Sequence, residues 1–490
     1  MLKKAVLLGL VAYVVLYFLF LFFNLHLIPI AWLDEVMGLD PGFRLANGQG
    51  YTSYFWPQKG TEDFFLAYLP IQPLMHYLHQ LVLPFDIYWV RFPWAIYLLL
   101  GSILFYASMR KLGLSTLFSM GMLLLIINEK SLFETTRGVR VEPLIFLAIC
   151  SAIYARIKNW PVLQSVVSTT LVFMHPDVWP IALVLYLDAI GSSYKAYKRS
   201  GKTIAIVLTP LTSTLLFLLF IDFDVVSFVG QFLHQGNDHS ASGNLFHRLH
   251  AHFIDRFWPY YISQPWIPTL VYAAFVYAIY NIVHKQGNYL SYGVLVTHLV
   301  WCIILGPFPR YNSILIVLSL LLLAKPLYLM WKNLNPNIAH TALIGLCILS
   351  SADVVIRHTM AIVQREERNP YAVIHWLQEE FPKEDTYLIT GSDIAYYAMA
   401  EDTTAGYFLY NIPPYKYDFN KYARLLLLLD NKDSACTQLA EYHTTQGKWS
   451  KKFGKKTYKN LYLQEVKSPL AYAELLQRLD YKNRAEVESR

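Results

Sequence analysis

The stretch AVLLGLVAYVVLYFLFLFFNLHLIPIAWLDE, residues 5–35, decides the fold class of this protein. It contains no Asp, Glu, Lys or Arg before Asp34 and Glu35, so it is longer than the apolar core of about 7 to 15 residues in a secretion signal. No small-x-small cleavage motif closes it. The stretch therefore predicts a retained first membrane span that ends at two adjacent carboxylates.

The composition of the whole chain agrees with a membrane protein. Of its 490 residues, 55% are hydrophobic and 15% are charged, whereas roughly a quarter of a soluble protein is charged. The net charge of +7 does not indicate a nucleic-acid binder, because the basic residues recur in short loops between apolar runs instead of gathering on one face. We therefore expect the lipid bilayer, and no nucleic acid, among the partners.

Ten further runs without Asp, Glu, Lys or Arg follow the first one. They are residues 92–109, 112–128, 143–155, 159–176, 178–187, 203–221, 257–283, 286–309, 311–324 and 333–352. A helix perpendicular to the bilayer needs about 20 residues to cross it, and most of these runs approach that length. Counting each run as one crossing predicts a mainly α, polytopic bundle of about 11 spans.

The charges of the loops predict the orientation of these spans. If residue 1 is cytoplasmic, every second loop should be basic. Apart from Asp188, which directly follows the apolar run 178–187, these loops contain no acid. They carry Arg110, Lys111, Arg156, Lys158, Lys195, Lys198, Arg199, Lys202, Lys285, Lys325 and Lys332. An odd number of spans then predicts the N-terminus inside and the C-terminus outside, with a transmembrane domain at 1–357 and a soluble extracytoplasmic domain at 358–490.

Three outward regions are large enough to carry a function. The loop at 31–90 is rich in aromatic residues, and its stretches Phe64–Leu69 and Leu74–Leu83 suit amphipathic helices in the interface. The loop at 222–265 holds five histidines but no HExxH motif, which favours a wet loop near headgroups over a metal site. We expect both loops to contribute to the site.

The region 358–490 is more polar and predicts a small α/β domain. We expect a helix near 370–380, a strand at Thr386–Thr390 and a hairpin in the Lys-rich stretch before Val466. No internal repeat is visible, which argues against the repeat-built transporters.

Charged residues at the predicted outer membrane boundary are the candidate functional groups, because charges at this depth are costly unless they pair, bind a ligand or face water. They are Asp34 and Glu35 after the first run, Glu134, Arg137, Arg140 and Glu142 after the third, and Arg310 ahead of the tenth. Outward arginines oppose the inside-positive trend, and their forked donors suit phosphate oxygens. Two plainer interpretations stay open: the first two arginines pair with their neighbouring glutamates, and Arg310 anchors the interface.

In order and spacing, these motifs resemble the GT-C superfamily of membrane glycosyltransferases, which includes the protein O-mannosyltransferases and the lipid A aminoarabinose transferases. The resemblance covers residues 1–355 and rests on four elements, Asp34-Glu35, Tyr68-Leu-Pro70-Ile-Gln-Pro73-Leu74, Arg140-Val-Glu142-Pro143-Leu144 and Arg310-Tyr311. The sequence departs from the family at two positions: Glu142 stands where many members have Asp, and His175-Pro176 stands where Lys-Pro is common.

The resemblance implies an enzyme that moves a sugar from a polyprenyl-phosphate donor to an acceptor hydroxyl on the non-cytoplasmic face, with inversion. Asp34 is then the base, and Glu35 orients it or binds the acceptor. The donor phosphate is bound by Arg310 first, and then by Arg137, Arg140 and His175. Glu142 is a second acidic position that would complete a divalent-cation site with Asp34, although two carboxylates do not establish a metal.

Two other classes of function stay open. A transporter or flippase for lipid-linked sugars or polysaccharides would need an ionisable residue near the membrane midplane, and Asp188 is a candidate. A non-catalytic cell-envelope assembly subunit would present the C-terminal domain to a partner. For the glycosyltransferase that the resemblance implies, the acceptor is a glycolipid, a polysaccharide or a protein. The absence of Asn-x-Ser/Thr motifs from the outward segments favours a bacterial inner membrane.

Overall fold

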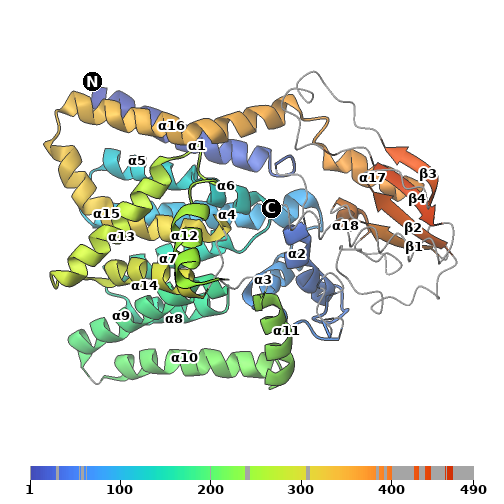
Figure 1. The fold of residues 1–490 in the computed structure, drawn as a ribbon, viewed down its shortest axis with the longest axis horizontal. Helices are drawn as coiled ribbons and strands as arrows, with labels where there is room; N and C mark the ends of the chain where they lie inside the picture. Colours follow the sequence, from blue (N-terminus) through green and yellow to red (C-terminus); the bar gives the residue numbers. More distant parts are fainter. Residues whose placement is uncertain are drawn as a thin grey trace. The chain divides into compact units, whose positions relative to one another are not determined.

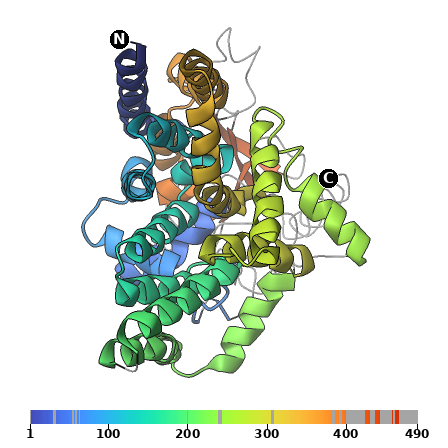
Figure 2. The same ribbon diagram turned by 90° about the vertical axis from the view of Figure 1, so that its left-hand side faces the viewer.

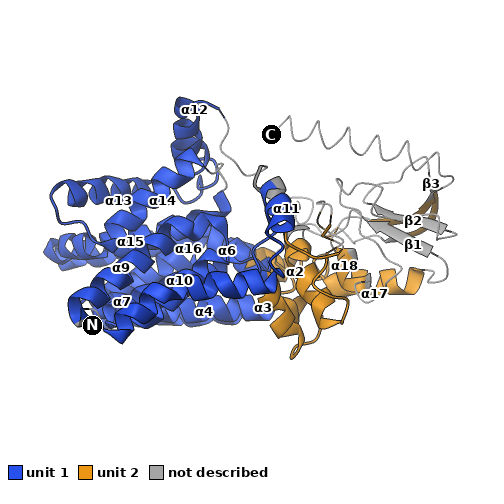
Figure 3. Cartoon of the chain, turned by 90° about the horizontal axis from the view of Figure 1, so that it is seen from below, with its two compact units in different colours: residues 1–23, 68–72, 92–357 blue, residues 24–67, 73–91, 358–490 orange. Residues whose placement is uncertain are grey.

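The computed structural model describes residues 2–28, 33–53, 56, 60–61, 63–198, 200–237, 243–304, 309–381, 386–390, 394–399, 424–429, 436–442, 458 and 461–466. The chain forms two compact units, coloured blue and orange in Figure 3. Unit 1 comprises residues 1–23, 68–72 and 92–357. Unit 2 comprises residues 24–67, 73–91 and 358–490.

Unit 1 is built of helices (Figure 1). Its elements are α1 (Leu2–Phe23), α4 (Ile87–Lys111, from residue 92), α5 (Thr116–Ile127), α6 (Lys130–Arg137), α7 (Glu142–Ile157), α8 (Pro161–Val172), η1 (Pro176–Val178), α9 (Trp179–Tyr197), α10 (Gly201–Phe220), α11 (Val225–Asn237), α12 (Leu245–His250), η2 (Ala251–Asp255), α13 (Trp266–Val283), α14 (Tyr289–Ile303), η3 (Pro309–Tyr311), α15 (Asn312–Asn333) and α16 (Pro336–Val363, to residue 357).

Six helices of the described residues are long and apolar enough to cross a membrane, so the chain is an integral membrane protein. They are Lys3–Phe23, Ile87–Lys111, Gly201–Phe220, Trp266–Val283, Pro309–Asn333 and Pro336–Val363. A seventh span results if α5 and α6, which bend by 61° at their break, cross together. Each predicted run contains a helix, although α1 ends at Phe23 and not at Leu33. The count of about eleven spans and their orientation stay predictions.

The core of unit 1 surrounds α15. Its first half, Asn312 to Ala324, is buried, and it packs against α5, α7, α13 and α14 (Figures 1 and 2). The run is uncharged and rich in Leu and Ile, so every face of the helix can be covered by other helices. Close helix contact also needs small residues: a Cβ on Gly101 of α4 would lie 2.6 Å from the Phe146 ring of α7.

Unit 2 combines helices with a small sheet. Its elements are α2 (Leu33–Ala46), α3 (Ile71–Gln80, from residue 73), α17 (Pro370–Glu380), β1 (Thr386–Thr390), α18 (Ile394–Met399), β2 (Arg424–Leu429), β3 (Cys436–Tyr442) and β4 (Leu461–Val466). The strand order is β1-β2-β4-β3, with β1 parallel to β2 and the other pairs antiparallel. The predicted helix at 370–380 and strand at 386–390 are found. The strands β3 and β4 pair antiparallel, whereas the Lys-rich stretch in which the hairpin was predicted lies, apart from residue 458, outside the described residues.

The predicted helix at Phe64–Leu69 is wrong, whereas the one at Leu74–Leu83 overlaps α3. Phe65 shows why the first stretch is irregular: its N–H donates to the carbonyl of Tyr51 at 2.8 Å, so the backbone bonds across the loop and not along a helix. Its ring contacts Tyr51 and Trp56, with centroids 5.7 and 5.3 Å away. The apolar residues are thus buried within the loop itself.

Candidate functional site

The site in unit 1 begins at the break between α5 and α6. Glu129 starts α6 because its carboxylate accepts hydrogen bonds from the N–H groups of Ser131 (2.7 Å) and Leu132 (2.8 Å). The short helix ends at Arg137. Residues 138–141 then turn into α7, whose first residue is Glu142 and whose second is proline, which suits a helix start.

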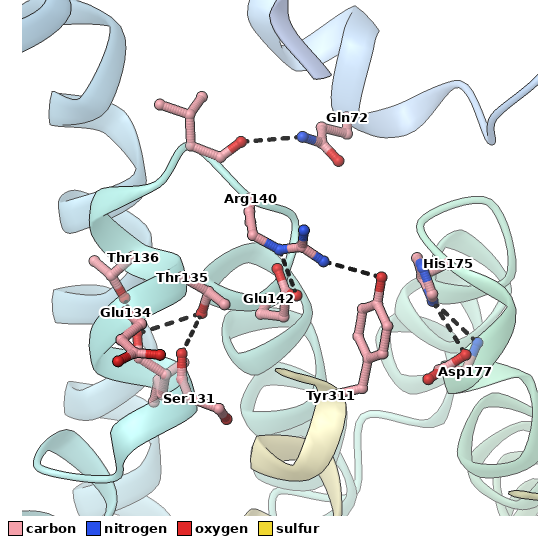
Figure 4. Close-up of polar contacts among 12 residues, drawn as sticks. Gln72, Ser131, Glu134, Thr135, Thr136, Arg140, Glu142, His175, Asp177 and Tyr311 are labelled. Carbon is pink, nitrogen blue, oxygen red and sulfur yellow. Dashed lines mark hydrogen bonds and ion pairs between the residues drawn. The ribbon is translucent and has the colours of Figure 1, made fainter. Parts of the chain in front are cut away.

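Val139 in this turn has a strained backbone. Its φ of +53° lies in the left-handed region, which is unfavourable for a β-branched residue and costs about 1–3 kcal/mol. The side chain is buried, and its carbonyl accepts a hydrogen bond from Gln72 Nε2 at 3.0 Å (Figure 4). Packing therefore holds the turn, which places Arg140 just before α7.

Arg140, Glu142 and Tyr311 form a connected group that we call the Arg140 cluster (Figure 4). Arg140 Nε donates to Glu142 Oε1 at 2.9 Å, and its Nη2 donates to the Tyr311 hydroxyl at 3.0 Å. The Glu142 side chain is fully buried. Its second oxygen, Oε2, accepts no hydrogen bond from any residue that the structure describes. The carboxylate therefore keeps one acceptor position for a further donor or a cation.

His175 lies against this cluster. Its ring centroid is 4.1 Å from that of Tyr311 and 5.6 Å from that of Tyr68. The N–H of Asp177 donates to His175 Nδ1 at 3.2 Å (Figure 4). Because Nδ1 accepts this bond, the hydrogen of the neutral ring belongs on Nε2. His175 and Arg140 thus both contact Tyr311, from its two sides (Figure 4), and each is a hydrogen-bond donor that suits an anionic ligand.

A buried arginine that directly follows η2 lies in the same part of unit 1. Arg256 Nε donates to Asn312 Oδ1 at 2.6 Å, and its guanidinium lies 3.8 Å from the Trp301 ring centroid and 3.8 Å from Asp177 Oδ2. Burial lowers the pKa of Arg256 to about 10, and the Asp177 carboxylate opposes that shift. The group is therefore still cationic at neutral pH and lies near the carboxylate of Asp177, whose N–H donates to His175.

The other predicted phosphate ligands lie in different surroundings. The guanidinium of Arg137 is buried, donates to the carbonyl of Phe133 at 3.2 Å and covers the Phe133 ring. Glu134 pairs with Arg357 at 2.8 Å. The plain pairing of arginine with glutamate that the sequence left open is thus observed for Arg140 with Glu142. Arg310 lies in η3, directly before Tyr311, and is exposed.

The acid pair that follows the first apolar run belongs to unit 2. Asp34 is the second residue of α2, and its side chain lies outside the described residues. Glu35 is fully buried and is bound by Arg91 at both oxygens, Nε to Oε1 at 2.8 Å and Nη2 to Oε2 at 2.6 Å. The Tyr397 hydroxyl donates to Oε1 at 2.6 Å. Both oxygens of Glu35 are therefore engaged within the protein.

Among the described residues, no group of three or more His, Cys, Asp or Glu side chains is arranged to hold a metal ion. The described histidines of the loop at 222–265 lie in two different surroundings, one buried and one exposed. His252 is buried and hydrogen-bonds His298 at 2.9 Å, and burial lowers its pKa to about 2, whereas His250 is exposed and pairs with Asp255 at 3.2 Å. The proposed cation site of Asp34 with Glu142 stays a prediction.

Five residues of these clusters received no role from the sequence: Arg91, Asp177, Arg256, Tyr311 and Tyr397. Arg91 and Arg256 meet the criterion that selected Arg310, because each is an arginine on the predicted outer side next to an apolar run. Tyr311 was quoted only as part of a motif. Asp177 and Tyr397 carried no signal, since one acid in a loop and one tyrosine among many are unremarkable in a sequence.

Of the comparisons with known proteins, the one with solved structures shows the fold. No protein-family model and no curated protein matches the sequence. The structure is similar to the crystal structure of ArnT from Cupriavidus metallidurans bound to undecaprenyl phosphate, with a TM-score of 0.57 and 9% sequence identity over 94% of this chain and 98% of that one. The chain therefore has the fold of ArnT, and the GT-C resemblance of the sequence is confirmed at the level of the fold.

Proposed function

We propose that this protein is a glycosyltransferase that moves a sugar from a polyprenyl-phosphate donor to an acceptor hydroxyl on the non-cytoplasmic face of a bacterial inner membrane, with inversion. The observation that carries the proposal is the likeness over 94% of the chain to ArnT, whose structure has undecaprenyl phosphate bound. At 9% identity that likeness concerns the fold, so the chemistry is argued from this chain's own side chains.

The Arg140 cluster with His175 supports binding of the donor phosphate. The guanidinium of Arg140 and the Nε2–H of His175 are hydrogen-bond donors, and both contact Tyr311. Such donors stabilise the negative charge that grows on a departing phosphate. Arg310 stays a proposed phosphate ligand because its exposed guanidinium is next in sequence to Tyr311. Arg137 is the weakest candidate, because it is buried against its own helix.

The proposed reaction has one proton and one leaving group to place. The acceptor oxygen attacks the anomeric carbon, the bond from that carbon to the phosphate oxygen breaks, and polyprenyl phosphate leaves with the electron pair. The acceptor proton passes to Asp34, a role in which a positioned carboxylate gains about 10²–10⁴-fold. The open oxygen of Glu142 would accept a hydrogen bond from a substrate hydroxyl or bind a divalent cation.

The transporter alternative has less support in unit 1. Asp188 of α9, the acid that favoured it, is paired with Arg156 at 2.5 Å and accepts a hydrogen bond from Gln164 at 3.0 Å. The Asp188 carboxylate therefore already has an arginine and an amide as partners, whereas a coupling site must change its protonation or its ligand during transport.

Lipid mass spectrometry and reconstitution test the proposal. A strain without the gene should accumulate a polyprenyl-phosphate sugar, and the purified protein in lipid vesicles should consume that donor and release polyprenyl phosphate. A reporter fused after residue 360 should be active only outside the cytoplasm. If no lipid-linked sugar accumulates and none is consumed, the proposal is wrong; cytoplasmic reporter activity would overturn the orientation.

A further inference from the structure

Both carboxylate oxygens of Glu35 accept hydrogen bonds from buried donors, which does not suit a catalytic base. Its side chain and that of Arg91 are each fully buried, and the two parallel hydrogen bonds of 2.8 and 2.6 Å form a bidentate pair. Arg91 also donates through Nη1 to the carbonyl of Leu25 at 2.8 Å. A carboxylate whose oxygens are both occupied by buried donors cannot also accept the proton of a substrate without breaking the pair.

The last donor to Glu35 comes from the other end of the chain. Tyr397 of α18, 362 residues later, donates its hydroxyl to Glu35 Oε1 at 2.6 Å. Burial, and then the Glu35 charge, raise the pKa of Tyr397 well above 10, so the phenol keeps its proton and remains a donor over the whole physiological range. We call Glu35, Arg91 and Tyr397 the Glu35 cluster.

The segment that carries Tyr397 is attached to the first outer loop by further contacts within unit 2. The Tyr397 ring stacks on Phe85, with centroids 5.6 Å apart and planes at 22°. The Tyr371 hydroxyl of α17 donates to Asp86 Oδ1 at 2.8 Å. The amide of Asn24 lies 3.3 Å from His358 Nδ1. The residues after 357 are therefore packed into the first outer loop and are not a separately attached domain in this part of the chain.

We propose that Tyr397 of the C-terminal region is a positioning residue for the transfer reaction, because it closes the Glu35–Arg91 pair and so fixes the first turn of α2, the turn that carries Asp34. Glu35 then acts through its neighbour and is not itself the base. The C-terminal region gains a role that its sequence did not indicate: it completes the support of the catalytic turn. This inference rests on the proposed function.

The test compares Tyr397→Phe with Tyr396→Phe. The two tyrosines are adjacent in α18 and both are buried, but the Tyr396 hydroxyl reaches Asp40 at 3.4 Å and not Glu35. A misplacement of about 1 Å in a catalytic group can cost about 10²-fold. We expect kcat per folded molecule to fall by about tenfold or more in Tyr397→Phe, with the donor KM within about twofold of wild type. The Tyr396→Phe variant should keep wild-type kcat.

A double-substitution experiment separates positioning from general stability. In a Glu35→Gln background, Tyr397→Phe should cause little further loss of kcat, because both residues act through one contact. Equal kcat for the Tyr397→Phe and Tyr396→Phe variants, or fully additive losses with Glu35→Gln, would overturn the inference. If wild type transfers no sugar from any polyprenyl-phosphate donor, the proposed function fails; if it does and Tyr397→Phe is silent, only this inference fails.

Discussion

The two units each contain a buried arginine paired with a buried glutamate and joined by a tyrosine hydroxyl, yet the two groups differ in one respect. In the Glu35 cluster the arginine binds both carboxylate oxygens and Tyr397 adds a further bond. In the Arg140 cluster the arginine donates to one oxygen of Glu142 and also to the hydroxyl of Tyr311. One carboxylate oxygen of Glu142 has no donor among the described residues.

This difference indicates that the Glu35 cluster stabilises the structure, whereas the Arg140 cluster is suited to bind a ligand. A buried carboxylate with every oxygen occupied is satisfied, and removing a partner leaves a buried charge, so such a pair holds the structure. A buried carboxylate with one unfilled acceptor carries a desolvation cost that a ligand can remove. We therefore expect substitutions in the Glu35 cluster to affect stability and alignment, and substitutions in the Arg140 cluster to affect the handling of substrate.

The largest effect is expected for Asp34, the residue that the Glu35 cluster would hold. Asp34→Asn keeps the size of the side chain and removes its charge, so transfer should fall by about 10²-fold or more, the lower part of the range for a lost general base. Insertion and thermal midpoint should match wild type. The measurement is initial-rate transfer in vesicles, normalised to folded protein. Near-normal turnover of Asp34→Asn would show that another residue is the base. The proposal that Tyr397 positions Asp34 would then lose its basis.

The comparison itself is tested by Glu35→Gln and Glu142→Gln. Breaking a buried pair costs about 3–5 kcal/mol, so Glu35→Gln should lower the thermal midpoint strongly because Arg91 loses its bidentate partner. Glu142→Gln should lower kcat/KM by about ten- to a hundredfold per folded molecule, as expected for one charge-assisted bond of about 1.5–3 kcal/mol, with a smaller thermal shift. Equal thermal losses with full activity per folded molecule would make Glu142 a second supporting pair.

A smaller effect is expected for the substitutions Arg140→Lys, in the Arg140 cluster, and Arg310→Lys, next to it in sequence. Lysine cannot reproduce the two bonds of Arg140 to Glu142 and Tyr311, and at Arg310 it cannot replace a bidentate grip on phosphate. We expect both variants to weaken donor use by about tenfold, and Arg310→Ala to remove most of it. Competition by sugar-free polyprenyl phosphate isolates the phosphate contact.

The same competition assay distinguishes the two interpretations of Arg310. An interface anchor needs only a long cationic side chain, so Arg310→Lys would be silent in that case. Wild type and Arg310→Ala binding the phosphate lipid equally would mark Arg310 as an anchor and leave the phosphate to Arg140 and His175.

The smallest effect is expected for a third ion pair, Asp188 with Arg156, whose side chains are 19% and 30% exposed. Partly exposed pairs are worth about 0–1 kcal/mol, so Asp188→Asn should change transfer by less than about twofold and the thermal midpoint only slightly. A complete loss of function in this variant would favour the transporter, for which a membrane acid is essential.

Local patterns in the sequence predicted local structure well. The helix at 370–380 and the strand at 386–390 follow from side-chain periodicity, which depends only on near neighbours. Periodicity failed at Phe64–Leu69 because those apolar side chains pack against Tyr51 and Trp56, which an amphipathic pattern does not register. Helix α2 was missed, since the apolar run hid the end of α1 at Phe23.

By itself, the sequence determined that the chain is a membrane protein, because uncharged runs are a property of the chain as written. The order of its charged motifs gave a resemblance that agrees with the fold it shares with ArnT. The sequence also selected Asp34, Glu35, Arg140, Glu142 and His175 as residues of interest. Only the tertiary structure decided which of these carboxylates is occupied and which is open. Arg91 and Tyr397 reach Glu35 from 56 and 362 residues away, and Tyr311 reaches Arg140 from 171 residues away. Contacts between residues so far apart arise from packing of helices, and no local pattern encodes them.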